Sequence, residues 1–275
     1  MDLRTQRCQD VLDRVERCWG VRLDREVAVL KRRSLGARTD RDTWIRLEVR
    51  PLSKVTGQGS GVEGAAGLPE AVAKPEWYQG LSWCAPEQRV LWRADETELV
   101  TAAPIKPGGV LSTDPGLVQA WWATLGTSLA ALAAHTTTRI ATPHTVPISQ
   151  ERVTETIEGV FPGCVETTVT QWSVAHADLA WTNLTAPRCW LLDWEDWGLA
   201  PRGWDAATLW GNSLALPELA QRVQREYRAD LDSRSGLLSQ LFFCCELVAA
   251  GDDYAGLLAE PSRRETARLV SSLQS

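Results

Sequence analysis

The stretch His176-Ala-Asp-Leu-Ala-Trp-Thr-Asn183, followed by Cys189-Trp-Leu-Leu-Asp-Trp-Glu-Asp196, is the most informative part of the sequence. Asp178 and Asn183 lie five positions apart, so one tight loop can hold both, and Asp193 ends an apolar run that predicts a short strand. Phosphoryl transfer requires a carboxylate at the attacking hydroxyl and oxygen ligands that hold Mg²⁺ on the nucleotide phosphates. The order and spacing therefore predict Asp178 as the catalytic carboxylate, with Asn183 and Asp193 as metal ligands.

The same segment resembles the signature of the aminoglycoside phosphotransferase and choline kinase family. The catalytic loop of that family reads approximately HGDxxxxN and precedes a hydrophobic strand and a D-W-E/D element. This chain is similar in HADLAWTN, in LLDWED and in GLAPRGWDAA (198–207), which matches the start of the family's next helix. The resemblance implies a bilobal protein-kinase-like fold of the α+β class, and a phosphotransferase that uses ATP, or GTP, with Mg²⁺.

Two positions depart from the family pattern. Ala177 stands where the family usually has Gly, and Ala180 where it often has His. An alanine at position 177 is strained if the loop requires a positive φ there. Neither change removes a predicted metal ligand or the predicted base.

Hydrophobic periodicity divides the chain into a small strand-rich lobe on the nucleotide side, 1–107, and a larger helical lobe with the catalytic loop, 108–275. The expected helices are 3–19, 86–98, 114–135, 149–160 and 165–172, with further helices after residue 205. The expected strands are 26–33, 43–50, 189–192 and 99–105, the last of which begins with a hinge that would bind the adenine edge. The glycine-rich segment 53–69 is expected to be a flexible loop.

The resemblance also implies a strand lysine that binds the α- and β-phosphates and pairs with a helical glutamate. Lys74 is the candidate, because it lies on a short apolar stretch ahead of the expected helix 86–98, with Glu87 as its partner. Lys31, on the first expected strand, is the alternative.

The loop 34–42 lies where a turn that covers the phosphates is expected, although Gly36 is its only glycine. Arg38 and Arg41 are the predicted phosphate contacts of this loop, because the guanidinium fork matches phosphate oxygens.

Other residues of the informative segment are expected to act as scaffold. His176 is expected to orient its neighbours, and Asp205 to accept backbone N–H groups of the catalytic loop. Glu195 and Asp196 either touch a second Mg²⁺ or cap local structure. Five tryptophans crowd this segment, and core packing is their expected role, with an aromatic-lined substrate cleft as the alternative. They are Trp172, Trp181, Trp194, Trp197 and Trp204.

Composition limits the remaining choices. The chain has 275 residues and a net charge of −6, and this acidic balance argues against a nucleic-acid partner. No window of eighteen apolar residues predicts a membrane span, and the charged start lacks a secretory signal, so a cytoplasmic protein is expected. The seven cysteines form no CxxC pair, so reduced and mostly buried thiols are expected rather than a zinc site.

The acceptor stays open at this stage. It is either a small hydroxylated molecule, such as an aminoglycoside or an amino alcohol, or the Ser/Thr of a peptide. In the peptide case the chain would act as the kinase of a lanthipeptide- or thioamitide-type dehydration pathway, with a separate lyase as partner. A third interpretation is a non-catalytic scaffold that binds nucleotide.

Overall fold

The structure is a computed structural model that describes residues 2–5, 8–26, 28–55 and 57–274. Residues 6, 7, 27 and 56, which belong to the expected helix 3–19, strand 26–33 and loop 53–69, lie outside the described residues. The chain forms two compact units, Met1–Gly67 with Pro75–Thr101 and Leu68–Lys74 with Ala102–Ser275.

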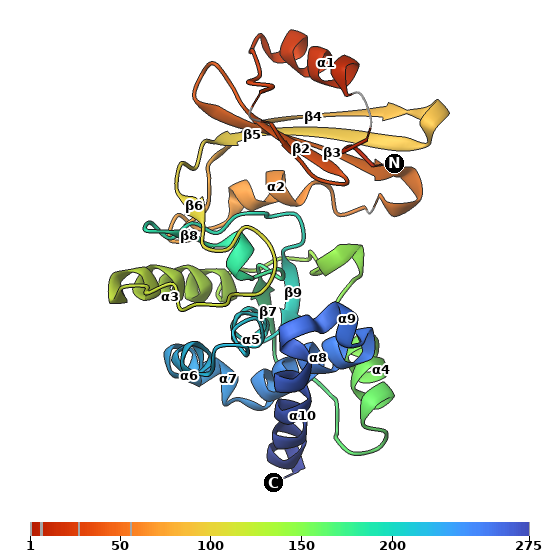
Figure 1. Cartoon of the computed structure of the whole chain (residues 1–275). Helices are drawn as coiled ribbons and strands as arrows, with labels where there is room; N and C mark the ends of the chain where they lie inside the picture. The colour runs from red at the N-terminus through yellow and green to blue at the C-terminus, as the bar shows by residue number, and fades with distance from the viewer. Residues whose placement is uncertain (1, 6–7, 27, 56, 275) are drawn as a thin grey trace. The chain divides into compact units, whose positions relative to one another are not determined.

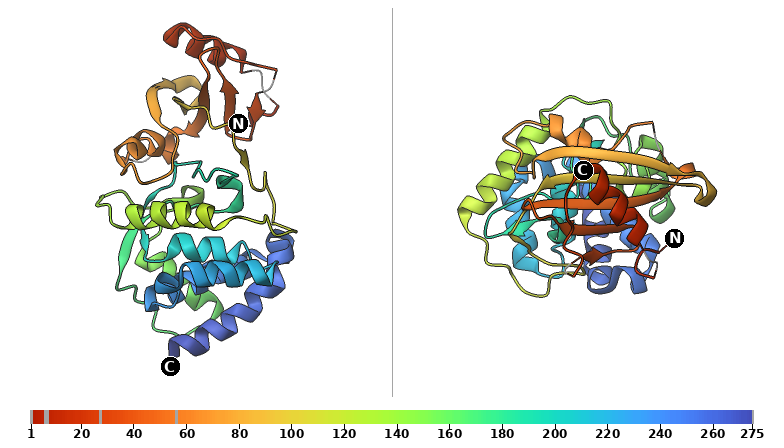
Figure 2. Two further views of the ribbon diagram at one scale, coloured as in Figure 1. Left: turned by 90° about the vertical axis from the view of Figure 1, so that its left-hand side faces the viewer. Right: turned by 90° about the horizontal axis from the view of Figure 1, so that it is seen from above.

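The smaller unit is built on a five-stranded antiparallel sheet with the strand order β1-β2-β3-β5-β4. The strands are β1 (Val29–Leu30), β2 (Ser34–Arg38), β3 (Thr43–Pro51), β4 (Trp77–Ala85) and β5 (Val90–Glu98). Helices α1 (Gln9–Trp19) and α2 (Gly61–Gly64) lie on opposite faces of this sheet (Figures 1 and 2). Three-residue 3-10 turns follow β3, α2 and β4, at Leu52–Lys54, Ala65–Gly67 and Pro86–Gln88.

Alternating side chains explain why α1 covers one face. Ile45, Leu47 and Val49 on β3 are buried, while the residues between them are half-exposed. Leu12 and Val15 of α1 pack with the first two of these in one core. The residues that alternate with them on β3, Trp44, Arg46, Glu48 and Arg50, belong to the other face of the sheet.

Four expectations for this unit need correction. The expected loop 53–69 contains α2 and the 3-10 turn Ala65–Gly67, and the described part of the expected strand 26–33 is regular only in β1. The expected loop 34–42 is strand β2 plus a short turn, and Gly36 lies under Trp44, whose ring atom Cζ2 would be 2.1 Å from a Cβ at that position. The expected helix 86–98 is a tight turn followed by β5. Its Val90, Trp92 and Ala94 are all buried and alternate with the half-buried Leu91 and Arg93, which is the period of a strand.

The larger unit is mostly helical. Its helices are α3 (Gln119–Ala133), α4 (Gln150–Val160), α5 (Trp204–Gly211), α6 (Pro217–Glu226), α7 (Arg228–Leu231), α8 (Arg234–Ala250), α9 (Asp252–Ala255) and α10 (Ala259–Gln274). Helix α8 lies at the centre of the group and contacts α4, α5 and α10 (Figure 1). Two small antiparallel pairs accompany them, β6 (Ala103–Pro104) with β8 (Thr185–Ala186) and β7 (Trp172–Ala175) with β9 (Gly198–Pro201). The 3-10 turns are Pro143–Thr145, η5 (Trp181–Asn183) and Gly256–Leu258.

Several local expectations for this unit need correction. The segment 165–172 is not a helix and ends in β7, 189–192 forms only an isolated bridge at Leu191, and 99–105 is regular only in β6. Four of the five tryptophans near the catalytic segment are buried as expected, whereas Trp172 is 36% exposed. All seven cysteines are free thiols, but only Cys189, Cys244 and Cys245 are buried. Within the described residues, none of the helices has both the length and the apolar character needed to cross a bilayer.

Candidate active site

The loop that follows β7 is fixed by one buried carboxylate. Asp205, in the first turn of α5, accepts the backbone N–H of His176 at 2.7 Å through Oδ2 and that of Ala177 at 2.9 Å through Oδ1. Trp204 donates its indole N–H to the carbonyl of Ala177 at 3.1 Å. Burial raises the pKa of Asp205 to about 6, against the opposing effect of the two N–H donors. The expected organising role of Asp205 agrees with these contacts.

Ala177 adopts a φ of +74°, in the left-handed region that favours glycine. A side chain other than glycine is strained there by about 1–2 kcal/mol. The two hydrogen bonds to Asp205 hold the neighbouring backbone in this conformation. The alanine that replaces the usual glycine therefore keeps the loop shape at the expense of local strain.

His176 connects the loop to the segment that carries Asp193. Its Nε2 lies 2.8 Å from the carbonyl oxygen of Leu192, and its ring meets Trp194 edge-on with centroids 4.6 Å apart. Complete burial lowers the pKa of His176 to about 4, so the ring is neutral near pH 7 and Nε2 donates the proton. This is the scaffold role expected for His176.

Asp178 and Asn183 are in direct contact. The Asn183 side-chain amide donates to the Asp178 carbonyl at 2.8 Å and to its carboxylate Oδ2 at 2.9 Å. Turn η5 makes this possible by bending the chain between them, with the Asn183 N–H bound to the Ala180 carbonyl at 2.9 Å. Burial, followed by the charge of Asp193, raises the pKa of Asp178 to about 6, while His144 and Asn183 act in the opposite direction. A carboxylate with a pKa near neutrality is suited to accept a proton from a hydroxyl.

Asp193 is brought to the same place by backbone pairing. The Leu192 N–H donates to the Asn183 carbonyl at 2.8 Å, and Leu184 bridges Leu191, so the segments that carry Asn183 and Asp193 lie side by side. Asp193 itself has a φ of +68°. Its charge is felt at Asp178, where it disfavours ionisation.

The donor set fits a hard cation bound together with phosphates. Because the amide nitrogen of Asn183 is used by Asp178, its oxygen is the atom that can bind a metal, and Asp193 adds carboxylate oxygens. Among the residues that the structure describes, no group of three or more His, Cys, Asp or Glu side chains could hold a metal ion by itself. Mg²⁺ is commonly held in this way, by one or two carboxylates with phosphate oxygens and water.

Asp196 ties a second loop to this segment. Its carboxylate accepts the Thr142 hydroxyl at 3.1 Å, and its carbonyl accepts the Thr142 N–H at 2.9 Å. Of the two roles left open for Asp196, these bonds support the local structural one.

The predicted pairing of Lys74 with Glu87 loses its basis, because the expected helix 86–98 is a turn followed by β5. Lys74 belongs to the larger unit, where the neighbouring Ala73 binds the Ser128 hydroxyl and the Leu191 N–H through its backbone. Glu87 is exposed in the turn beyond β4, a nine-residue strand that spans about 30 Å. The pairing was inferred from a helix that is strand β5, and a role for Lys74 at the phosphates stays a prediction.

Arg38 and Arg41 lie in or beside the β2–β3 turn of the smaller unit. Arg38 forms an ion pair with Asp42, and Arg41 donates to the Gly20 carbonyl at 2.9 Å. Both side chains are exposed, as is Lys31, the alternative lysine. Their proposed contacts to phosphate also stay predictions.

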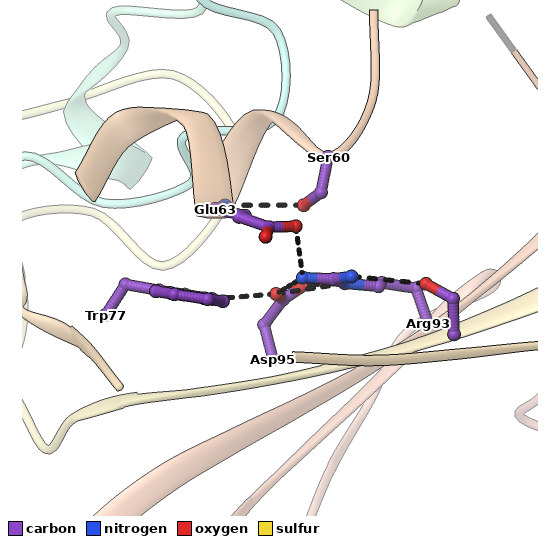
Figure 3. Close-up of polar contacts among 6 residues, drawn as sticks. Ser60, Glu63, Trp77, Arg93 and Asp95 are labelled. Carbon is purple, nitrogen blue, oxygen red and sulfur yellow. Dashed lines mark hydrogen bonds and ion pairs between the residues drawn. The ribbon is translucent and has the colours of Figure 1, made fainter. Parts of the chain in front are cut away.

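A polar network that the sequence analysis missed covers the sheet face opposite α1 (Figure 3). Arg93 on β5 donates to Glu63 of α2 at 3.0 Å and to Asp95 at 2.6 Å, and Trp77 donates its indole N–H to Asp95 at 2.9 Å. Gly80 leaves room for the guanidinium, since a Cβ there would lie 1.9 Å from Arg93 Nη2. The period-two pattern of β5 was the signal that would have placed Arg93 and Asp95 on one face.

Comparison with known proteins is informative at the level of structure. No protein-family model and no curated protein matches the sequence. The chain superposes on the aminoglycoside phosphotransferase APH(4)-Ia with a TM-score of 0.60 and 11% identity, over 97% of this chain and 99% of that one. It superposes on the choline kinase LicA from Streptococcus pneumoniae with a TM-score of 0.54 and 12% identity, over 97% and 98%. It superposes on the amicoumacin kinase hAmiN, in complex with AMP-PNP, Ca²⁺ and Ami, with a TM-score of 0.56 and 12% identity, over 94% of this chain and 93% of that one.

These likenesses extend over nearly the whole of each chain. They confirm the expected α+β, protein-kinase-like fold. The similar structures include an aminoglycoside phosphotransferase and a choline kinase, the two groups whose motifs the sequence resembles. The chain thus has the fold of the aminoglycoside phosphotransferases and choline kinases.

Proposed function

We propose that this protein is a phosphotransferase that moves the γ-phosphoryl group of ATP onto a hydroxyl of a small molecule. The contact between Asp178 and Asn183, with Asp193 paired alongside, is the observation that carries this proposal. The proposal is supported by the raised pKa of the Asp178 carboxylate, by the amide and carboxylate oxygens next to it that would hold a cation, and by a fold shared with named kinases.

Each residue has a distinct task. Asp178 orients the acceptor hydroxyl and takes its proton as the oxygen attacks the γ-phosphorus, while the bond from that phosphorus to the β-phosphate oxygen breaks and leaves ADP. Asn183 holds the Asp178 carboxylate in position through its amide nitrogen. Asn183 Oδ1 and Asp193 would hold Mg²⁺, which neutralises phosphate charge when bound. Asp205 and His176 keep the loop in shape.

The solved relatives point to the class of acceptor. Their names include an aminoglycoside phosphotransferase, a choline kinase and an amicoumacin kinase. A small hydroxylated molecule is therefore the proposed acceptor. A Ser/Thr peptide, with its partner lyase, is the alternative that the experiment must separate.

The test is phosphate transfer followed by mass spectrometry. The protein is incubated with Mg²⁺ and ATP, or GTP in a parallel series, and with a panel of aminoglycosides and amino alcohols, then with a Ser/Thr-rich peptide. We expect a mass gain of one phosphate on a small molecule, and a decrease in turnover of about 10²–10⁴ for Asp178→Asn, the usual contribution of a positioned acid or base. Asp253→Asn, at the start of the short helix α9, is the matched control and should keep wild-type turnover.

Three other outcomes are informative. Transfer to the peptide alone would replace the small-molecule acceptor with a peptide. Near wild-type transfer by Asp178→Asn would remove Asp178 as the base. Binding of ATP without transfer to any acceptor or to water would favour a non-catalytic scaffold.

A further inference from the structure

The segment Ala103–Lys106 is paired along the catalytic loop. Strands β6 and β8 align Ala103 with Ala186 and Pro104 with Thr185. The pairing continues beyond the strands, since the Ile105 N–H donates to the Leu184 carbonyl at 2.8 Å and the Lys106 N–H to the Trp181 carbonyl at 3.2 Å. The backbone of Lys106 is thus fixed within one hydrogen bond of turn η5, which carries Asn183.

The register sets Lys106 close to the candidate catalytic groups. One residue beyond the pair Ile105–Leu184, the chain reaches Lys106 on one side and Asn183 on the other. Asn183 in turn contacts Asp178. A lysine side chain extends about 6 Å from its Cα on a flexible four-carbon stem, so its ammonium group can reach a ligand bound at these residues.

The catalytic loop lacks a cation of its own. The run from His176 to Asn183 contains no Lys or Arg, and neither does the run from Cys189 to Asp196. Asp178 is instead surrounded by further negative charge, from Asp193 and Asp196. A nucleotide triphosphate brings more negative charge to the same place than one Mg²⁺ neutralises, and phosphoryl transfer depends on electrostatic stabilisation of that charge.

Lys106 is placed to supply the charge. It is half-buried at the head of a tight turn, in which the Gly108 N–H donates to the Lys106 carbonyl at 2.7 Å and both Gly108 and Gly109 have positive φ. Its side chain forms no hydrogen bond or ion pair with any of the described residues. Lys106 is thus a half-buried lysine whose backbone is paired to the acidic loop and whose ammonium group has no partner among the described residues, so it is available to an anionic ligand.

We propose that Lys106 binds an oxyanion at the candidate active site, either a phosphate of the nucleotide or an acidic group carried by the acceptor. This inference rests on the proposed function. Lys106 binds and orients the anion as a point charge with three donors, and no proton leaves it during the reaction. The transferred group and the base remain those described above.

Binding measurements separate the two sources of the oxyanion. Titration calorimetry compares wild type, Lys106→Met and Lys106→Arg for AMP-PNP and for ADP, each with Mg²⁺, and then for inorganic phosphate added to protein saturated with Mg²⁺ and AMP-PNP. Lys54→Met, which removes an exposed lysine of the smaller unit, is the matched control. A charge-assisted contact predicts that Lys106→Met loses about 10- to 100-fold in affinity for the anion it binds, and that Lys106→Arg keeps part of it.

Each outcome has a definite meaning. Weaker AMP-PNP binding by Lys106→Met, with Lys54→Met unchanged, identifies the nucleotide phosphate. If Lys106→Met weakens the binding of inorganic phosphate but not of either nucleotide, the oxyanion is an acidic group of the acceptor. Wild-type affinities for all three probes would overturn the inference while leaving the proposed function intact. A wild-type protein that binds neither nucleotide would instead overturn the proposed function.

Discussion

Each unit of the molecule contains a buried aspartate, and the two are satisfied by different kinds of donor. Asp205, at the start of α5, accepts backbone N–H groups of two consecutive residues. Asp95, on β5, accepts the side chains of Arg93 and Trp77. A carboxylate bound by backbone groups fixes the path of the main chain, whereas one bound by side chains fixes how elements pack. We therefore expect the loop 176–183 to depend on Asp205 alone, and the members of the sheet network to be replaceable as pairs.

The largest effect is expected from removal of Asp205, the aspartate that is bound by backbone N–H groups. Asp205→Ala removes both acceptors and leaves two buried N–H groups without a partner, each worth about 1–3 kcal/mol, so we expect a loss of about 4 kcal/mol in the free energy of unfolding. Urea titration followed by tryptophan fluorescence measures it. Asp205→Asn, which keeps one acceptor oxygen, should lose roughly half as much.

Asp232→Ala is the control for this prediction. Asp232 is exposed at the end of α7, approaches Arg228 only to 3.8 Å and accepts one exposed hydrogen bond, from Gln224 Nε2 at 2.8 Å. Because these contacts are hydrated, removal of Asp232 should change the free energy of unfolding by less than about 0.5 kcal/mol. Equal losses for Asp205→Ala and Asp232→Ala would show that the loop does not depend on the buried carboxylate.

The next largest effect is expected for Asp95, the aspartate that is bound by side chains. Arg93→Met leaves Asp95 buried with the Trp77 indole N–H as the side-chain donor that remains among the described residues, and we expect a loss of about 3 kcal/mol in the free energy of unfolding. The double variant Arg93→Met/Asp95→Leu should recover at least half of that loss, because an apolar pair of similar size can replace a buried ion pair. Glu63 is half-exposed and can be hydrated in both variants.

Ser82→Ala provides the matched control in the same network. It removes a 3.2 Å hydrogen bond to Arg93 Nη1 at an exposed position, so the expected change is within about 0.5 kcal/mol. A double variant that is as unstable as Arg93→Met alone would mean that the network, like Asp205, cannot be exchanged in pairs.

The same contrast explains how much of the molecule is predictable from sequence. Asp178, Asn183 and Asp193 lie within sixteen residues, so the spacing alone indicated that they act together, and the structure places them side by side. The sheet network joins residues 63, 77, 93 and 95, which meet only after β4 has paired with β5 and α2 has packed against β4. No local spacing encodes that meeting.

The prediction of a helix at 86–98 was wrong for a specific physical reason. Pro86 fits the first turn of a helix, and the expected helix followed from it. In the structure Arg89 adopts a left-handed φ of +53° and reverses the chain, so that β5 pairs with both β3 and β4. Strand pairing overrode a local helix signal, so the predicted Lys74–Glu87 pair no longer has the helix on which it relied.

The smallest expected effect concerns the strain in the backbone-bound loop. Ala177→Gly relieves about 1–2 kcal/mol of left-handed strain, but it also loses a buried methyl group, about 0.8 kcal/mol, and gains freedom in the unfolded chain, about 0.5–1 kcal/mol. These contributions nearly cancel, so the expected net change is within about 0.5 kcal/mol. Ala175→Gly, at an equally buried position of β7 without a positive φ, has the same losses and no relief, and should cost about 1.5 kcal/mol. The difference between the two variants in urea titration therefore measures the strain at Ala177, at about 1–2 kcal/mol. Equal destabilisation by both variants would show that the positive φ at Ala177 costs no free energy of unfolding, and that the loop held by Asp205 is not strained.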